Sequence, residues 1–363
     1  MSISPLPPVV HLLPRDVARG SQVYARAVCD LLDRADDPHL VVTLFGGPPV
    51  LLRPDHSLGV APGRLRALGL DPRVLFRLRS WLRHRPVRAL VAHGGEAYKY
   101  AALVAPRGLP IVYYRIGAVL PGARRPPGRW WHAGLLHRAA VVVCVSEDVR
   151  IETRDLFGVP DARLAVIANG RDPATYAPGP TQMRSIVSIG FVGELAPTKR
   201  PEWLLSAVSA LRAEGIAVEG LLVGDGPLAA SLASRAAAAG VRYLGRSDDI
   251  PGVLKDLDVL LLPSTRQEGM PGVIIEAGLA GVPVVATDAP GVRDVVVPGQ
   301  TGLIVGVDDL DAAIAALRRL AGDRDLRARM GKAARAHCEQ RFSLSSSAAA
   351  WRRLLGDITA AGG

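Results

Sequence analysis

The sequence predicts two α/β domains, each a doubly wound layer of parallel strands with crossover helices. Length is the first reason: 363 residues with 49% hydrophobic composition exceed one ordinary domain and can fill two cores. The second is the alternation of short β-branched runs with helical stretches, which is typical of parallel sheets. The third is residues 168–185, where prolines and glycines favour an extended link between two domains.

The expected strands are short apolar runs on both sides of this link. Before it they read VVHLL, VVTLF, ALVAH, PIVYY and AVVVCVS, and after it SIGFVG, GLLVG, VRYLG, VLLLP, PVVAT and GLIV. Residues 344–363 predict a last helix whose apolar side returns to the first domain. We therefore expect domains at residues 1–175 together with 344–363, and at residues 182–340. Ligands of such layers bind beyond the carboxyl ends of the strands.

The positive charge of the chain belongs to its first half. Residues 1–180 hold 24 Lys and Arg against 14 Asp and Glu, whereas residues 181–363 hold 20 of each kind. A field of this kind attracts phosphate, anionic lipid or nucleic acid. An arginine-rich genome that places arginine on solvated faces explains the same count equally well.

Targeting and redox signals favour a cytoplasmic protein. The start of the chain is too interrupted by proline for a signal peptide, and no run reaches about 18 apolar residues. Cys29, Cys144 and Cys338 have no metal-ligand spacing, so we expect reduced structural thiols.

Residues 268–276, EGMPGVIIE, carry two carboxylates across a turn and the start of a helix. Glu268 is expected on the loop and Glu276 about two turns inside the helix, where both can accept hydrogen bonds from sugar or ribose hydroxyls. A surface loop followed by an amphipathic helix explains the spacing equally well.

Two further turns follow strands of the second half. In FVGELAPTKRPEWLL, Gly193 ends a strand, and Lys199 and Arg200 stand before a helix, which predicts a diphosphate site. An exposed loop with two solvated bases is the alternative. In LLVGDGPL, the turn that begins at Gly224 brings backbone close to a ligand or caps a helix. Three such turns on one sheet edge favour a common anionic ligand.

Over nearly its full length the chain resembles the retaining GT-B glycosyltransferases of family 4. The motifs that carry the resemblance are SEDVR, VIANGRD, FVGELAPTKR, VGDGP, YLGRSDDIP, DVLLLPSTRQEGMPGVIIEAGLAGVPVVATDAPGVRDVV and GQTGLIV. The resemblance implies two Rossmann-like domains that face a central cleft. It implies that residues 1–175 with the C-terminal helix bind the acceptor, and that residues 182–340 bind a nucleotide-sugar donor.

The resemblance also implies roles for single residues. Lys199 pairs with the donor diphosphate, Glu268 lies at the donor sugar, and Glu276 holds the ribose. Gly20 matches a glycine loop that closes over the phosphates. The backbone of three successive residues meets sugar hydroxyls: Gly269, Met270 and Pro271. The expected donor site further includes Gly193, Arg200, Gly224 and Arg246.

The chemistry of the expected reaction requires no metal and no other cofactor. Breaking the bond between sugar and phosphate leaves negative charge on the diphosphate, which Lys199, Arg200 and helix-terminal amides stabilise. In the family, the acceptor attacks from the face that the diphosphate leaves, and the leaving phosphate serves as the base. The configuration is then retained, and Glu268 and Glu276 are not a hydrolase dyad.

The sequence departs from the family pattern at two positions. Glu194 stands where such enzymes commonly carry Arg, so Arg200 substitutes for the missing cation or Glu194 points away. Arg115 follows the strand after which the family often places a histidine, which leaves His93 as the candidate catalytic residue on the acceptor side. A packing or capping role for His93 is the alternative.

Other motifs favour structural duties. Asp256 and Asp258 form a D-x-D pattern before a buried strand, where capping or turn duty is expected. The basic-aromatic run at residues 76–88 predicts a crossover helix whose apolar stripe joins the core. Residues 123–138 set Trp130 and Trp131 among bases, which favours contact with the acceptor or with an anionic membrane.

We therefore expect a metal-independent retaining hexosyltransferase. It moves a sugar from a UDP- or GDP-sugar to a hydroxyl of a glycan, lipid or small molecule, in the cytoplasm or at the cytoplasmic membrane face. Two alternatives stay open: a GT-B nucleotide-sugar epimerase, and a non-catalytic basic protein that binds lipid or nucleic acid. The sequence holds no nucleic-acid motif, so no nucleic-acid partner is expected.

Overall fold

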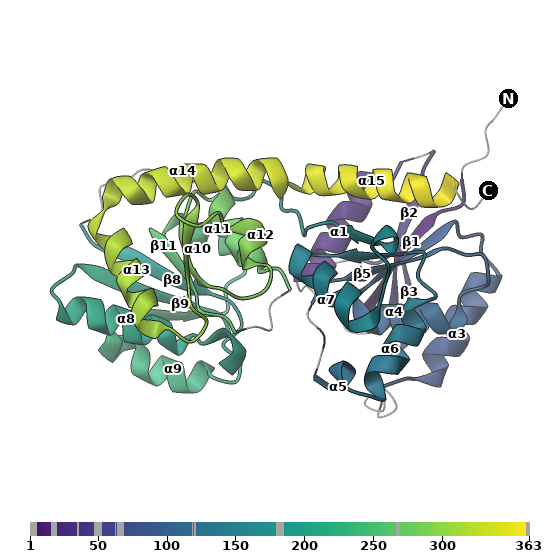
Figure 1. Ribbon diagram of the computed structural model, residues 1–363, viewed down its shortest axis with the longest axis horizontal. Helices are drawn as coiled ribbons and strands as arrows, with labels where there is room; N and C mark the ends of the chain where they lie inside the picture. The colour runs from purple at the N-terminus through teal and green to yellow at the C-terminus, as the bar shows by residue number, and fades with distance from the viewer. Residues whose placement is uncertain are drawn as a thin grey trace. The chain divides into compact units, whose positions relative to one another are not determined.

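The computed structural model describes residues 6–15, 20–34, 36–46, 53–61, 63, 69–117, 119, 121–178, 185–265 and 269–360. The chain divides into two compact units (Figure 1). Unit 1 comprises Met1–Gly170 and Leu344–Gly363, and unit 2 is Arg171–Ser343. The C-terminal helix therefore belongs to the unit that contains the N-terminus.

Unit 1 is built on a seven-stranded parallel sheet with the strand order β3-β2-β1-β4-β5-β6-β7. The order reverses between β1 and β4, the kind of point at which doubly wound sheets bind ligands. The strands are β1 (Val9–Arg15), β2 (His39–Phe45), β3 (His56–Val60), β4 (Ala89–His93), β5 (Ile111–Arg115), β6 (Val141–Cys144) and β7 (Leu164–Val166).

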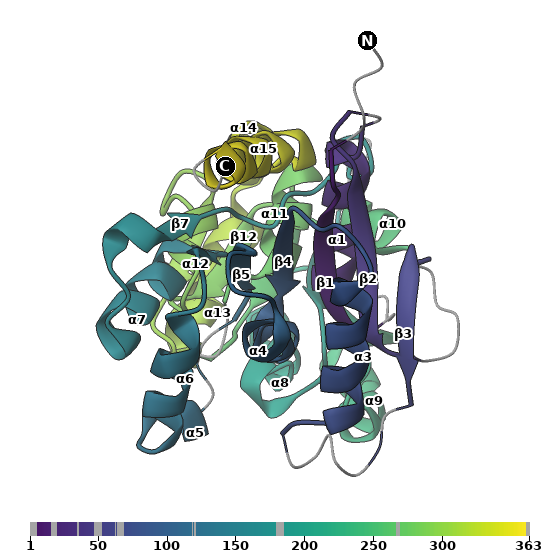
Figure 2. The ribbon, with the colours of Figure 1, turned by 90° about the vertical axis from the view of Figure 1, so that its right-hand side faces the viewer.

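Helices cover both faces of this sheet (Figure 2). They are α1 (Gly20–Leu32), α3 (Pro72–Arg83), α4 (Gly94–Val104), α5 (Pro121–Arg124), α6 (Gly128–Leu136), α7 (Glu147–Phe157) and α15 (Leu344–Ala360), with a short 3-10 helix η1 (Asp161–Arg163). The C-terminal helix α15 packs beside α1, and α3 packs beside α4. Trp351 anchors α15: its side chain is fully buried, and its Nε1 donates to the Tyr24 hydroxyl at 2.9 Å.

Unit 2 is built on a six-stranded parallel sheet with the order β10-β9-β8-β11-β12-β13. Here the order reverses between β8 and β11. The strands are β8 (Val187–Val192), β9 (Val218–Val223), β10 (Val241–Gly245), β11 (Val259–Leu262), β12 (Val284–Thr287) and β13 (Gly302–Val305).

The helices of unit 2 form two layers around its sheet. They are η2 (Pro197–Lys199), α8 (Glu202–Ala213), α9 (Ala229–Ala236), η3 (Ala237–Ala239), α10 (Ile250–Lys255), α11 (Gly272–Leu279), α12 (Val292–Val295), α13 (Leu310–Gly322) and α14 (Arg324–Arg341). Helices α8 and α13 pack together, as do α11 and α14 (Figure 1). Gly278 permits the second pairing, because a Cβ there would lie 2.5 Å from the sulfur of Cys338.

The strands expected from apolar runs are all present, but two strands were missed. β3 and β7 are the two edges of the sheet of unit 1, and their residues are partly exposed. An edge strand with polar residues among its apolar ones carries little of the signal that marks a buried parallel strand.

Several structural readings of the sequence are confirmed. Helix α3 buries Leu78, Trp81 and Leu82, as expected of a crossover helix, although Phe76 is exposed. All three cysteines are buried and free. Asp256 is the C-cap of α10, the predicted capping duty, whereas Asp258 accepts a hydrogen bond from the backbone N of Ser188 at 2.9 Å, a contact with the neighbouring strand and not a turn.

Candidate functional site

Two glycine turns meet at the carboxyl edge of the sheet of unit 2. Gly193 follows β8 and Gly224 follows β9. A Cβ on Gly224 would lie 1.8 Å from the carbonyl oxygen of Gly193, so only glycine fits at this contact. The backbone N of Leu195 donates to the carbonyl of Asp225 at 2.9 Å and ties the turns together. The two predicted turns therefore form one continuous surface.

The loop that carries Lys199 is tied to the end of β11. The backbone N of Thr265 donates to the carbonyl of Thr198 at 2.9 Å, and Lys199, which ends η2, is half-buried. Arg200 adopts a left-handed conformation with φ of 47°. Its guanidinium pairs with Asp308 and donates to the carbonyl of Val307. The charge of Arg200 is thus already matched by a carboxylate.

The third predicted turn leads into α11. Gly269, Met270 and Pro271 are all buried, and α11 begins at Gly272. Gly291 supports this bend closely, since a Cβ there would lie 2.2 Å from the carbonyl oxygen of Gly269. Glu268 lies outside the described residues.

A cavity of about 370 Å³ opens beside these turns. It is lined by Val192, Gly193, Glu194, Val223, Gly224, Asp225, Arg246, Ser247, Ile250, Val273 and Glu276. Four of the predicted donor residues are among them: Gly193, Gly224, Arg246 and Glu276. Of the other described candidates in unit 2, none lines this cavity: Lys199, Arg200, Gly269, Met270 and Pro271.

The lining of the cavity is acidic. Glu194, Asp225 and Glu276 contribute carboxylates, and Arg246 is the cation among the described lining residues. The Arg246 side chain is 73% exposed, and its Nε lies 3.7 Å from Asp248. Glu194, which stands where the resemblance leads us to expect Arg, is one of the residues that line the cavity.

Arg171 is a site residue that sequence reasoning missed. Its Nε donates to Oε1 of Glu276 at 2.7 Å, and both side chains are 15% exposed. Burial, with the charge of Glu276 nearby, raises the pKa of Tyr176 to about 12, so this phenol stays protonated beside the pair. The motif VIANGRD contains Arg171, but the motif alone does not reveal that its side chain reaches α11.

The candidates in unit 1 lie at the carboxyl edge of its own sheet or near it. Gly20 is the exposed first residue of α1. His93 ends β4 and is 2% exposed, and burial lowers its pKa to about 3. Arg115, which ends β5, is buried and pairs with Glu152 of α7, a structural contact.

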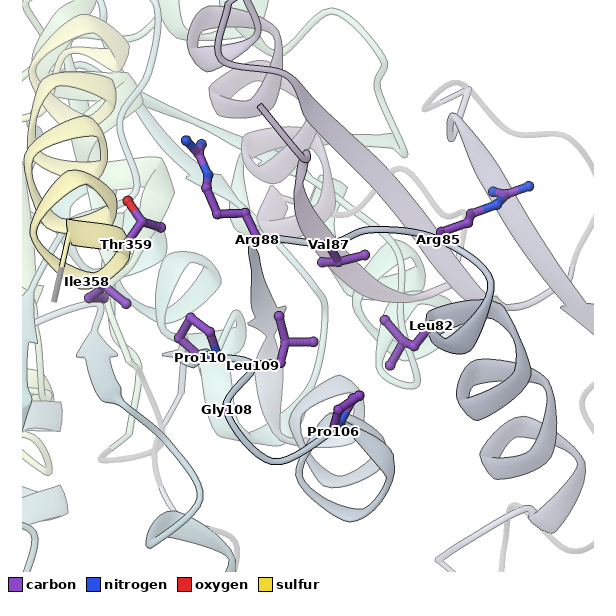
Figure 3. A pocket seen from close by; sticks show the side chains of 10 residues that line it. All are labelled: Leu82, Arg85, Val87, Arg88, Pro106, Gly108, Leu109, Pro110, Ile358 and Thr359. Atoms are coloured by element: carbon purple, nitrogen blue, oxygen red, sulfur yellow. The ribbon is translucent and has the colours of Figure 1, made fainter. Parts of the chain in front are cut away.

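A second cavity, of about 390 Å³, lies at the amino edge of the sheet of unit 1 (Figure 3). It is lined by Leu82, Arg85, Val87, Arg88, Pro106, Gly108, Leu109, Pro110, Ile358 and Thr359. None of the predicted site residues is among them. The amino ends of parallel strands are also not where such sheets bind substrates.

Two features are absent from the part of the chain that the structure describes. No group of three or more His, Cys, Asp or Glu side chains is placed to hold a metal ion. None of the described helices combines the length and the apolar character needed to span a bilayer.

Comparison with known proteins identifies the family. Residues 18–175 match the family described as Glycosyltransferase Family 4, and residues 187–323 match Glycosyl transferases group 1. A phosphatidyl-myo-inositol mannosyltransferase of Mycolicibacterium smegmatis is 28% identical over 338 residues, which cover 86% of this chain and 84% of that protein.

A D-inositol 3-phosphate glycosyltransferase of Gordonia bronchialis is 30% identical over 223 residues, 55% of this chain and 48% of that protein. That match spans about half the length of the relative. Among solved structures, Anabaena HepE in complex with UDP and glucose superposes with a TM-score of 0.81 at 20% identity, covering 97% of this chain and 100% of that one. This likeness shows the fold. The chain belongs to glycosyltransferase family 4, within the glycosyl transferases group 1, and has the GT-B fold.

Proposed function

We propose that the protein transfers a sugar from a nucleoside diphosphate sugar, with UDP or GDP as the nucleotide, to a hydroxyl of an acceptor. One observation carries the proposal: three strand-to-helix turns converge at the carboxyl edge of unit 2, and two of them border a cavity that also contains Glu276. Backbone amides at such turns bind phosphate oxygens, and a carboxylate beside them accepts hydrogen bonds from ribose hydroxyls. Unit 2 is then the donor-binding domain and unit 1 the acceptor-binding domain.

Lys199 supplies the cation for the leaving diphosphate in this proposal. It ends η2, and the hydrogen bond between Thr265 and Thr198 fixes its loop against the end of β11. A fixed ammonium group stabilises the charge that develops as the bond to the sugar breaks, without reorganisation at that moment. Arg200 contributes less than the sequence suggests, because Asp308 already neutralises its guanidinium.

The stereochemistry and the absence of a metal requirement follow from the same proposal. The leaving phosphate takes the proton of the acceptor hydroxyl on the face that it leaves, so the anomeric configuration is retained. The resemblance assigns Glu268 to the donor sugar, and we extend the proposal to hydrogen bonds between the sugar hydroxyls and the backbone of Gly269, Met270 and Pro271.

The acceptor belongs to the lipid-linked or glycan class in this proposal. The phosphatidyl-myo-inositol mannosyltransferase, by its name, acts on a lipid, and it aligns with 86% of this chain.

We also propose that α6 contacts anionic lipid, because Trp130 and Trp131 are 69% and 49% exposed beside the exposed Arg129. Amphipathic aromatic rings with cations suit the membrane interface. Co-sedimentation with anionic and neutral vesicles at low and high salt tests this contact; binding that ignores lipid charge would contradict it.

Turnover of nucleotide sugars tests the main proposal. We expect the purified protein to release UDP or GDP from at least one UDP- or GDP-sugar in the presence of a chelator, and to form a product with the anomeric configuration of the donor. Lys199→Ala should lower that rate at least about a hundredfold, as the loss of other preorganised transition-state contacts does. Lys255→Ala, an exposed lysine at the end of α10, is the matched control. Equal loss in both variants, or product of inverted configuration, would refute the assignment.

A further inference from the structure

Three buried histidines form a hydrogen-bonded line across adjacent strands of unit 1. His39 begins β2, His11 lies within β1, and His93 ends β4. Nε2 of His11 lies 3.0 Å from Nδ1 of His39, and Nδ1 of His11 lies 3.0 Å from Nε2 of His93. The three side chains are at most 3% exposed. The line therefore runs from the amino edge of the sheet to the carboxyl edge, across β1 and β4, where the strand order reverses.

Neutral rings allow only two proton arrangements in this line. Burial lowers the pKa of all three histidines, so each ring carries a single N–H at neutral pH. His11 then donates to one neighbour and accepts from the other. Either every proton sits on Nε2 and the donors point from His93 toward His39, or every proton sits on Nδ1 and the donors point the opposite way.

The charged groups at the amino edge select the first arrangement. Oδ1 of Asp37 lies 3.7 Å from Nε2 of His39, and a carboxylate attracts an N–H and repels a lone pair. The backbone N of His39 donates a hydrogen bond to the carboxylate of Asp33 at 2.8 Å, and Arg88 forms an ion pair with Asp37. Arg26 and Arg352 act on the rings only through their charge, which further disfavours an imidazolium.

The surroundings of His93, at the other end of the line, favour the same arrangement, with each proton on Nε2. Nδ1 of His93 is buried and has no hydrogen-bond partner among the described residues. In the second arrangement this atom would be an orphaned N–H donor, which is rarer in proteins than an orphaned acceptor. In the first arrangement, Nδ1 of His93 carries no proton, and its lone pair lies at the start of α4.

The residues at the start of α4 indicate which class of ligand the lone pair on Nδ1 of His93 can bind. His93 is the N-cap of this 11-residue helix and makes no side-chain capping bond. Gly94 and Gly95 follow in the first turn of the helix, whose backbone N–H groups have no acceptor within the helix, and Gly95 is exposed. A hydroxyl group is the partner that accepts from an N–H and donates to a nitrogen at the same time.

We propose that the line of histidines holds Nδ1 of His93 unprotonated, as the hydrogen-bond acceptor that orients the hydroxyl of the sugar acceptor in the ground state. The proton of that hydroxyl then passes to the leaving phosphate, and His11 and His39 are positioning residues that act through His93. This proposal rests on the proposed function, since it assumes that unit 1 binds the acceptor.

Tautomers are read directly by long-range ¹⁵N–¹H correlation spectra of the full-length protein labelled at histidine. At pH 7 we expect His11, His39 and His93 all to carry their proton on Nε2. A proton on Nδ1 of His93, or a doubly protonated ring among the three, would overturn the proposal. This reading needs no substrate, so it remains decisive if the glycosyltransferase assignment fails.

A surface variant tests the direction of the line without disturbing the core. Asp37→Ala removes the carboxylate that faces His39, and we expect a second set of signals with the proton on Nδ1 of His93. Asp36→Ala removes the same charge at the neighbouring exposed residue. We expect each of the three histidines to keep a single tautomer in this control. Identical spectra for both variants would contradict the role of Asp37 as the origin of the bias.

Catalysis tests the role of the lone pair, with water as the acceptor that is always present. In His11→Phe, we expect hydrolysis of the donor sugar to fall about tenfold, the equivalent of one hydrogen bond, with an unchanged KM for the donor. His11→Asn, which retains polar atoms in the line, should recover part of that loss. Unchanged hydrolysis in His11→Phe would refute the positioning role. UDP or GDP binding, measured separately by thermal shift, shows whether unit 2 still works as proposed.

Discussion

Arg171, the first residue of unit 2, holds the carboxylate of Glu276 on α11 through a 2.7 Å hydrogen bond between Nε and Oε1. The two residues are 105 positions apart. Glu276 lines the cavity, so Arg171 fixes the orientation of a carboxylate that the proposed donor would meet.

Removing this arginine should weaken nucleotide binding. In Arg171→Met, Glu276 loses its partner and its fixed rotamer, and we expect the Kd for UDP or GDP, whichever the wild type binds, to rise about tenfold, the worth of one charge-assisted hydrogen bond. Isothermal titration calorimetry measures the Kd. Arg318→Met, which breaks an exposed pair with Glu214, is the control and should leave the Kd unchanged. Equal Kd values in both variants would show that Glu276 does not depend on Arg171.

The charge of Glu194 should oppose the donor diphosphate. Glu194 lines the cavity at the position where the resemblance to the family leads us to expect Arg, so Glu194→Gln removes a like charge. We expect nucleotide affinity to rise about fivefold at low salt, consistent with about 1 kcal/mol between charges near a protein surface, and Glu194→Arg to raise it further. The gain should shrink as salt rises, because exposed charges are screened. An affinity that does not change in either variant would place the diphosphate away from this residue.

The contact between Gly224 and Gly193 should tolerate no side chain. In Gly224→Ala the new Cβ would lie 1.8 Å from the carbonyl oxygen of Gly193, so we expect the free energy of unfolding of unit 2 to fall by about 3 kcal/mol or more. Urea denaturation measures it. Gly215→Ala is the control: φ is positive at both glycines, +142° at Gly224 and +79° at Gly215, but no atom of the described residues lies within 4 Å of a Cβ added at Gly215, so only backbone strain of about 1 kcal/mol is expected. Similar losses in both variants would contradict the close packing of the turns.

Stability should fall as the pH falls below about 6.5. Burial lowers the folded-state pKa of His11 and His93, the latter to about 3, so the unfolded chain binds more protons over this range. Going from pH 7.5 to 5.5 should cost unit 1 on the order of 1 kcal/mol for each of these histidines. Urea titrations at both pH values check this, and His93→Phe should remove part of the slope. His132→Phe, an exposed histidine on α6, should not. A slope that is unchanged in His93→Phe would assign the effect to other groups.

The sequence predicts the parts of the fold that depend on short-range patterns. Buried parallel strands such as β4 and β8 are near-continuous apolar runs, and the helix around Trp351 has one apolar side, so both are visible without coordinates. The edge strands β3 and β7 were missed because partial exposure permits polar residues in them.

The site is predicted less completely, because its side-chain contacts join residues that are far apart in the sequence. Gly193, Gly224, Arg246 and Glu276 line one cavity, as a shared donor site requires. The pairing of Arg171 with Glu276, and that of Arg200 with Asp308, join residues more than 100 positions apart, which no local pattern encodes. The line from His39 to His93 depends in the same way on strand order, since β1 lies between β2 and β4 only in the folded sheet.

Equilibrium binding of free UDP and GDP tests the central claim most directly. A nucleotide that binds only the folded state raises its melting temperature. We predict that at least one of the two stabilises the wild-type protein and the Lys255→Ala control, and that Lys199→Ala and Glu276→Gln reduce this stabilisation strongly. If neither nucleotide stabilises the wild type, or if Lys199→Ala and Glu276→Gln respond as Lys255→Ala does, the cavity of unit 2 is not a nucleotide-sugar site.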